Sequence, residues 1–154
     1  MPNADGVTEM DIETLYPLVT EAIRRAEVLE DLHAPGAKDA YRDVSRLEER
    51  IASLLPPTDT EGAIARRGAV SAAISGGEFE RAIDLAVRFR EDIEADTSLA
   101  TDLDALRGRA TVFRAQEAGG LQSRYPAAFA QHGDSNIQNF IHAYRQQGAP
   151  LPIR

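Results

Sequence analysis

Cysteine and tryptophan are absent from this chain of 154 residues, and Lys38 is the one lysine among its 17 basic residues. The lack of cysteine excludes disulfide bonds, thiolate nucleophiles and cysteine-ligated metals, and it is compatible with a cytoplasmic protein. No stretch reaches the roughly 18 apolar residues that a membrane-spanning helix needs. Residues 1–10 hold neither a basic segment nor an apolar run, so we expect no signal peptide. We attribute the arginine bias to a GC-rich, bacterial genome.

Positive charge is also scarce, because the formal net charge is -8. Residues 1–57 hold 12 acidic and 6 basic side chains, residues 58–119 hold 12 and 8, and residues 120–154 hold 1 and 3. An acidic body is repelled by phosphate backbones and by anionic lipid surfaces. We therefore expect neither nucleic acid nor a membrane as the partner.

The composition is that of an ordinary globular protein, with 43% hydrophobic and 27% charged residues. A chain of this length suits one domain, or a small domain with an added hairpin, and folding buries roughly two-thirds of its surface. We expect it to fold without a metal or a disulfide bond.

Residues 10–57 carry the clearest pattern, two ladders of apolar residues spaced alternately three and four apart. The first is Ile12, Leu15, Val19, Ala22, Ala26 and Leu29, and the second is Ala37, Ala40, Val44, Leu47, Ile51 and Leu54. Such spacing places apolar side chains on one stripe of a helix, which another surface must cover. The turn at residues 33–36 is short, so the two helices form an antiparallel hairpin after a flexible terminus at residues 1–9. Pro17 leaves a second possibility open, in which the first helix begins near Tyr16.

Residues 58–119 predict a unit of three helices. The capping-box pattern of Thr58 and Glu61 opens a helix to Ser75 that is rich in alanine and glycine, and Gly76-Gly77 ends it. The next helix has the ladder Phe79, Ala82, Ala86, Phe89 and Ile93. A last helix begins at a cap formed by Thr97 or Ser98 and has the stripe Leu99, Leu103, Leu106, Ala110 and Phe113. We expect it to stop at Gly119-Gly120.

Residues 77–82, Gly-Glu-Phe-Glu-Arg-Ala, resemble the Gly-x-Tyr-x-x-Ala turn into the second helix of a tetratricopeptide repeat. The resemblance covers one hairpin, residues 63–94, about a fifth of the chain. A further repeat would begin at Thr97, but the helix expected there runs unbroken where a turn is due. The resemblance therefore implies the packing of one hairpin and not membership in the family.

Residues 120–154 are aromatic and nearly uncharged. A short helix is expected at about residues 124–131, and a Ser-x-x-Gln capping box at residues 135–138 opens an amphipathic helix to Gln147, followed by an extended tail. One face of that helix carries Ile137, Phe140, Ile141 and Tyr144. This set is our candidate for binding a partner protein, and packing on the chain's own core is the alternative.

Chemical motifs are few. Glu30 and His33 have the Glu-x-x-His spacing of dinuclear iron sites, but no second such motif occurs, so we expect no metal and no cofactor. We find no P-loop, Gly-x-Ser-x-Gly, His-Glu-x-x-His or Gly-x-Gly-x-x-Gly pattern. Two arginine pairs seven apart could hold an anion if they faced one another, although pairing with nearby acidic side chains such as Glu78, Asp84, Glu91 and Asp104 is the simpler expectation. The pairs are Arg81 with Arg88 and Arg107 with Arg114.

The sequence thus predicts an all-α protein of five to seven helices, in which an N-terminal antiparallel αα-hairpin packs on a three-helix unit and an amphipathic helix follows. We expect a protein–protein interaction module, such as an adaptor, regulatory subunit or assembly component, that binds another protein or itself through helix–helix contacts. The alternative is a small-molecule-binding or enzymatic bundle with a pocket lined by arginine and histidine. A third hypothesis is an acidic inhibitor that binds a basic protein through residues 1–57. The sequence favours a non-enzyme without deciding the question.

Overall fold

The computed structural model describes residues 11–94 and 96–124, and these residues form five α-helices and no strand. The helices are α1 (Ile12–Asp31), α2 (Ala37–Leu54), α3 (Thr60–Ser75), α4 (Phe79–Glu91) and α5 (Ser98–Arg124). The predicted all-α fold is confirmed, including the hairpin that α1 and α2 form. None of the described helices is long and apolar enough to cross a membrane.

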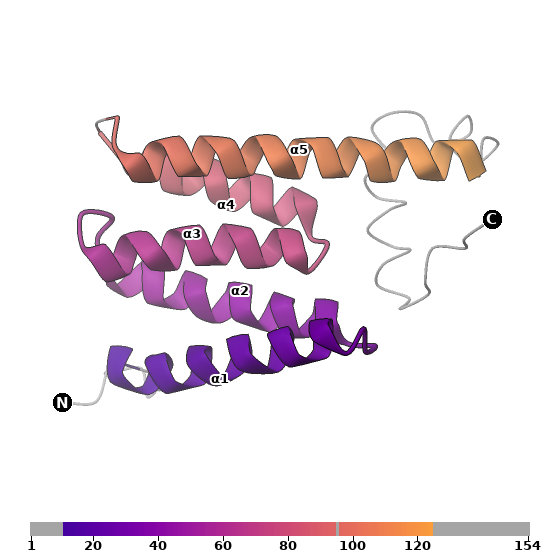
Figure 1. Ribbon diagram of the computed structural model, residues 1–154. Coiled ribbons are helices and arrows are strands. Elements are labelled where there is room, and N and C mark those ends of the chain that lie inside the picture. Colours follow the sequence, from indigo (N-terminus) through magenta and orange to yellow (C-terminus); the bar gives the residue numbers. More distant parts are fainter. Residues whose placement is uncertain (1–10, 95, 125–154) are drawn as a thin grey trace, which may run out of the picture. The chain divides into compact units, whose positions relative to one another are not determined.

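The described residues divide into two units, the first ending at Thr111 and the second beginning at Val112. Within the first, α1 packs against α2, α2 against α3, and α3 against α4. Figure 1 shows α1, α3 and the start of α5 in one layer, with α2 and α4 behind them. The boundaries predicted at residues 57 and 119 stay predictions. The flexible terminus predicted at residues 1–9, the helices predicted after Arg124 and the tail lie outside the described residues.

The helix at the centre of the first unit is α3, which packs against both α2 and α4. Eight of its residues are buried, and they lie on nearly all sides of the helix: Gly62, Ala65, Arg66, Ala69, Val70, Ala72, Ala73 and Ile74. The core that surrounds it includes the fully buried side chains Leu15, Leu85 and Leu103, together with Ile51. Each such side chain stabilises the fold by about 1.5–3 kcal/mol. Small residues on α3 let the neighbouring helices approach closely enough to share this core.

Two of the turns between helices have the same hydrogen-bond pattern. After α1, the backbone N–H of His33 donates to Glu30 (3.0 Å) and that of Ala34 donates to Leu29 (2.9 Å). This is a Schellman motif with His33 at its left-handed position, φ +50°. After α3, Gly77 takes that position with φ +75°. The predicted stops at residues 33–36 and at Gly76-Gly77 are confirmed.

The second possibility, in which the first helix begins near Tyr16 because of Pro17, is wrong. The helix begins at Ile12 and runs through Pro17. The Asp11 side chain accepts hydrogen bonds from the backbone N–H and the hydroxyl of Thr14, at 2.9 and 2.8 Å. Leu15 in the same turn is fully buried. Because the cap and the core fix this turn, the proline does not interrupt it.

Two further helix ends differ from the sequence prediction. The N-cap of α3 is Asp59, whose carboxylate accepts from the backbone N–H of Glu61 at 2.8 Å, and not Thr58. The predicted end of α5 at Gly119-Gly120 is wrong, because the helix continues to Arg124. Glycine lowers helix propensity by only about 1 kcal/mol and ends a helix where a left-handed turn is needed. Neither glycine has a positive φ here.

Gly62 and Gly108 make a matched test of this packing. A Cβ added at Gly62 would collide with the backbone carbonyl oxygen of Pro56, whereas a Cβ at Gly108 meets nothing within 4 Å. We expect Gly62→Ala to lower the free energy of unfolding by about 1–3 kcal/mol, and Gly108→Ala to raise it by about 0.5–1 kcal/mol. Urea denaturation of both variants measures the two effects. A Gly62→Ala protein as stable as the unsubstituted chain would show that α3 is not held so closely.

Candidate functional site

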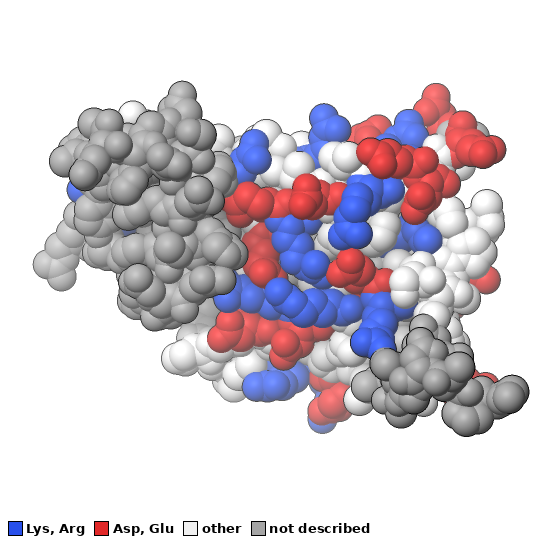
Figure 2. All heavy atoms as spheres, turned by 180° about the vertical axis from the view of Figure 1, so that it is seen from behind, with Lys and Arg blue, Asp and Glu red and all other residues white. Residues whose placement is uncertain are grey.

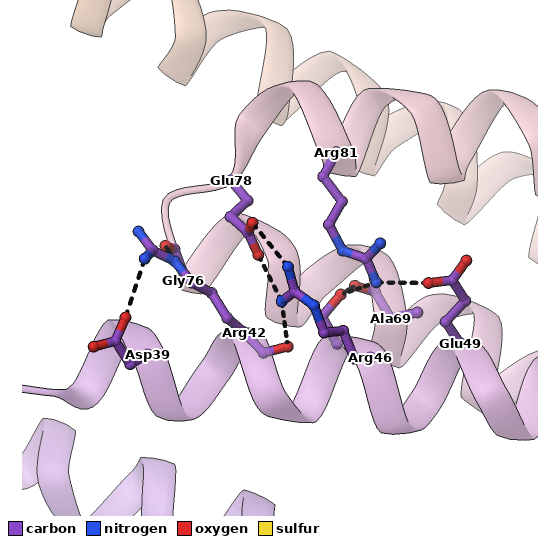
Figure 3. A network of polar contacts seen from close by, with 9 residues as sticks. Asp39, Arg42, Arg46, Glu49, Ala69, Gly76, Glu78 and Arg81 are labelled. Atoms are coloured by element: carbon purple, nitrogen blue, oxygen red, sulfur yellow. Dashed lines mark hydrogen bonds and ion pairs between the residues drawn. The ribbon is translucent and has the colours of Figure 1, made fainter. Parts of the chain in front are cut away.

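A network of polar contacts joins α2, α3 and α4 on one face of the first unit (Figure 3). At its centre is Ser45, which is fully buried and donates to the backbone carbonyl of Ala69 at 2.7 Å. Arg81 donates to the Ser45 hydroxyl at 3.2 Å and to the Glu49 carboxylate at 2.7 Å. One serine thus ties all three helices together.

Arg88 reaches the same carboxylate, because its guanidinium donates to the second oxygen of Glu49 at 3.2 Å. Burial raises the pKa of Glu49, but the hydrogen bonds and charges of Arg81 and Arg88 outweigh it and hold that pKa below the usual value. The two α4 arginines of the predicted anion site are therefore brought together, but on a carboxylate of α2. Glu49 was not among the partners that the sequence indicated.

The neighbouring turns of α2 have similar contacts. Arg42 donates to the backbone carbonyl of Gly76 at 2.9 Å, and Arg46 pairs with Glu78 at 3.2 Å. Figure 2 shows the result on this face, where Lys and Arg side chains alternate with Asp and Glu. Surface pairs of this kind contribute about 0–1 kcal/mol each. The face satisfies its own charges and offers no site of one sign.

Arg66 is the buried arginine of α3, with 5% of its surface exposed. It donates to the carbonyls of Gly62 and Ala52, both at 3.0 Å, and its guanidinium lies 5.6 Å from the ring centre of Phe89. Burial lowers the pKa of Arg66, and the charge of Asp92 opposes this effect. Its role is to satisfy a carbonyl at the C-terminal end of α2.

A cavity of about 440 Å³ adjoins this arginine. Two guanidinium groups line it, those of Arg66 and Arg88, but the carboxylates of Glu49 and Asp92 line it as well. Because the charges balance, the cavity has no net attraction for an anion.

The remaining predicted site residues lie on other elements. Arg107 is exposed on α5 within the first unit, and Arg114 belongs to the second unit. His33 is exposed in its turn, and Glu30 accepts a hydrogen bond from the Tyr41 hydroxyl at 3.0 Å. Among the described residues no three His, Cys, Asp or Glu side chains gather where they could hold a metal ion. The anion site stays a prediction, and the partner-binding set Ile137, Phe140, Ile141 and Tyr144 lies outside the described residues.

Glu48 is a buried carboxyl group that sequence reasoning missed. It stands on the apolar face of α2 and is 8% exposed. Its Oε1 lies so close to α3 that a Cβ on Gly68 would be 2.8 Å away. Burial, and next the charge of Glu61, raise the pKa of Glu48 to about 7. Its position one turn from Val44 and Ala52, both buried, was the available signal.

A cleft of about 660 Å³ lies at the starts of α3 and α5, which Figure 1 places at the same end of the first unit. We call it the α3–α5 cleft. Its lining consists of Pro57, Thr58, Asp59, Thr60, Ala63, Ile64, Arg67, Asp92, Ile93, Glu94, Thr97, Ser98 and Leu99. Ile64 is 50% exposed, and the other exposed residues of α3 are polar: Thr60, Glu61, Ser71 and Ser75.

Two arginines hold the walls of the α3–α5 cleft in place. Arg67 of α3 donates to Asp102 at 2.6 Å and to the Ser98 hydroxyl at 3.2 Å, which fixes α3 against α5. Arg90 of α4 donates to the Ile93 carbonyl at 3.4 Å and to Asp96 at 3.3 Å, which fixes the loop between α4 and α5. These hydrogen bonds and ion pairs fix the positions of the elements that form the walls of the α3–α5 cleft.

The charge at the α3–α5 cleft is negative. Three carboxylates line it, those of Asp59, Asp92 and Glu94, against the one guanidinium of Arg67. Asp102 already pairs with Arg67, and Asp59 caps α3. Within residues 11–94 and 96–124 no cation pairs with Glu94, which is exposed. A cleft with apolar walls and an acidic rim suits a ligand that is apolar and cationic.

Comparison with models of known protein families, with curated protein sequences and with solved structures finds no match for this chain. The resemblance of residues 63–94 to one tetratricopeptide hairpin therefore remains a likeness of pattern. The function has to be argued from the geometry alone.

The pKa of Glu48 predicts a pH dependence of stability. Because that pKa is about 7 in the folded protein and about 4.5 in the unfolded chain, the folded state holds a proton that the unfolded chain loses between these values. The contribution of Glu48 to the free energy of unfolding is therefore fully present below about pH 4.5, and it is lost as the pH rises through 7. We expect Glu48→Gln to raise the free energy of unfolding by about 1–2 kcal/mol at about pH 8 and to have little effect near pH 5.

Urea denaturation at the two pH values measures this difference. Glu27→Gln is the matched control, because Glu27 is an exposed glutamate of α1. An equal effect of the two substitutions at both pH values would contradict the assignment of a raised pKa to Glu48.

Proposed function

We propose that this protein is a protein–protein interaction module that binds a segment of another protein in the α3–α5 cleft. The observation that carries the proposal is the half-exposed Ile64, which stands in a cleft with apolar walls and an acidic rim. Exposed apolar side chains bordered by polar ones are typical of protein interaction sites. The chain would act as an adaptor, a regulatory subunit or an assembly component.

The polar groups of the cleft support a protein segment over a small-molecule substrate. Asp59 and Thr97 are already used as helix caps, and Arg67 is held by Asp102. What remains open to a ligand is the apolar surface around Ile64 and the exposed carboxylates of Asp92 and Glu94. A segment with one large apolar side chain and a flanking lysine or arginine matches both groups.

Three parts of the hypothesis rest on the sequence alone. The set Ile137, Phe140, Ile141 and Tyr144 remains a second proposed contact for a partner protein. A bacterial source and a cytoplasmic location are also proposals, supported by the arginine bias and the lack of cysteine. Self-association is one form that the interaction can take.

Selection of peptides tests the cleft. We would pan a displayed library of random peptides against the full chain and measure the affinity of the enriched sequences by fluorescence anisotropy. We expect an apolar residue beside a basic one, and affinity that falls with added salt. Ile64→Asp should weaken binding by about tenfold or more, and Glu94→Lys by about threefold with a smaller salt dependence.

Val112→Asp is the control, because Val112 is equally exposed, at 55%, but lies on α5 in the second unit. It should leave the affinity unchanged. Peptides that bind the Ile64→Asp protein as tightly as the unsubstituted chain would refute the cleft as the binding site, and so would a selection that enriches no sequence.

A further inference from the structure

Large apolar side chains are exposed on the outer face of α1 and at its C-cap, Leu32. Leu18 is 42% exposed, Val28 50% and Leu32 70%. The opposite face of α1, with Leu15 and Val19, is buried. In the first unit α1 is the outermost helix of the stack (Figure 1). These three side chains therefore face outward from its edge.

The three residues belong to a regular stripe. Together with the exposed polar residues between them, they alternate in steps of four and three: Thr14, Leu18, Glu21, Arg25, Val28 and Leu32. This is the spacing of a coiled-coil seam, along which a second helix packs. We call it the α1 stripe. From Thr14 to Leu32, the C-cap of α1, the stripe rises by about 27 Å, which corresponds to 18 steps of 1.5 Å.

The α1 stripe is complementary to itself. Leu18 and Val28 lie five residues before and after position 23, and Glu21 and Arg25 lie two residues before and after it. Suppose that two copies of α1 pack antiparallel about a two-fold axis that passes the helix at the level of position 23. A residue before position 23 in one copy then faces the residue equally far after it in the other copy. Leu18 of one copy then faces Val28 of the other, and Glu21 faces Arg25. Thr14 and Leu32, nine residues either side, face one another in the same register.

We infer that the partner on the α1 stripe is a second copy of this chain, packed antiparallel as a two-fold symmetric dimer. An unrelated partner would need no such symmetry, whereas a self-complementary stripe matches a C2 interface, in which each contact occurs twice. This surface is separate from the α3–α5 cleft, so the inference does not rest on the proposed function.

The charges on the stripe are free to make these contacts. Glu21 pairs with Arg24 at 3.4 Å, but both side chains are about 70% exposed, and pairs of this kind contribute little. For Arg25 no ion pair is seen with any described residue. In the dimer Glu21 would face Arg25 of the second copy, twice over. With three apolar side chains per copy, the dimer should be weak and depend on protein concentration.

Exchange of the two charges tests the register directly. Sedimentation velocity of the full chain, from low micromolar to millimolar concentration, should show a monomer that converts to a dimer. Glu21→Arg places an arginine opposite Arg25, and Arg25→Glu places a glutamate opposite Glu21. Each single substitution should weaken the dimer by about tenfold, because like charges meet twice. The double substitution should restore the affinity, since the pairs are opposite in sign again.

Two further variants keep the test decisive. Val28→Asp, at an exposed position that should not affect folding, should weaken the dimer by about tenfold or more. Ile64→Asp changes the α3–α5 cleft instead and should leave the dimer intact. Circular dichroism spectra of all variants should match that of the unsubstituted chain.

Three results would overturn the inference. One is a chain that stays monomeric at millimolar concentration. Another is a dimer that Val28→Asp does not weaken. The third is a double charge exchange that fails to restore what each single exchange loses, because the antiparallel register would then be wrong.

Discussion

The close contact between α2 and α3 is the interaction on which the rest of the structure depends. Ser45 is fully buried there and donates to the backbone of Ala69, and the Glu48 carboxylate lies against Gly68. Such contacts require small residues on α3, because a larger side chain would hold the two backbones apart. α1 then packs on α2, and α4 packs on α3. A loss of this contact would separate both pairs.

This contact also determines which surfaces remain free. On the face of α2 and α4, the arginines pair with Glu49 and Glu78 or donate to a backbone carbonyl, so that face supports the fold. The ion pairs of Arg67 and Arg90 hold the walls of the α3–α5 cleft but leave Ile64 uncovered. The same division applies to α1, whose inner stripe is core and whose outer stripe is exposed. The two surfaces that we propose for interaction are thus ones where exposed apolar side chains have no cover within the described residues.

Local patterns were enough to predict the helices. The apolar ladders identified α1 and α2, and the glycines after α3 identified a turn, because spacing and backbone conformation act over a few residues. Helix ends were harder to predict, since Gly119-Gly120 reads as a stop unless the backbone around it is known. The N-cap of α3 was predicted one residue too early, because Thr58 and Asp59 are both good N-cap residues and the turn geometry selects one of them.

The sites were less predictable than the helices, for a physical reason. Arg81 and Arg88 could be seen to share a face of their helix, but their partner Glu49 lies more than 30 residues earlier in the chain and is reached only through tertiary packing. The α3–α5 cleft combines residues from two loops and two helix starts, and no local pattern joins them. Ile64 was the available signal, as a large apolar residue on the polar side of an alanine-rich helix.

The measurement that tests the central claim most directly is an NMR titration of the isotope-labelled full chain with a peptide that binds it. Isoleucine and leucine methyl signals report on the cleft through Ile64, Ile93 and Leu99, and on α1 through Leu18 and Leu32. Binding in the α3–α5 cleft predicts saturable shifts at the first three, with the signals of Leu18 and Leu32 unchanged. Shifts confined to residues outside the cleft would contradict the claim that the cleft is where this protein meets its partner.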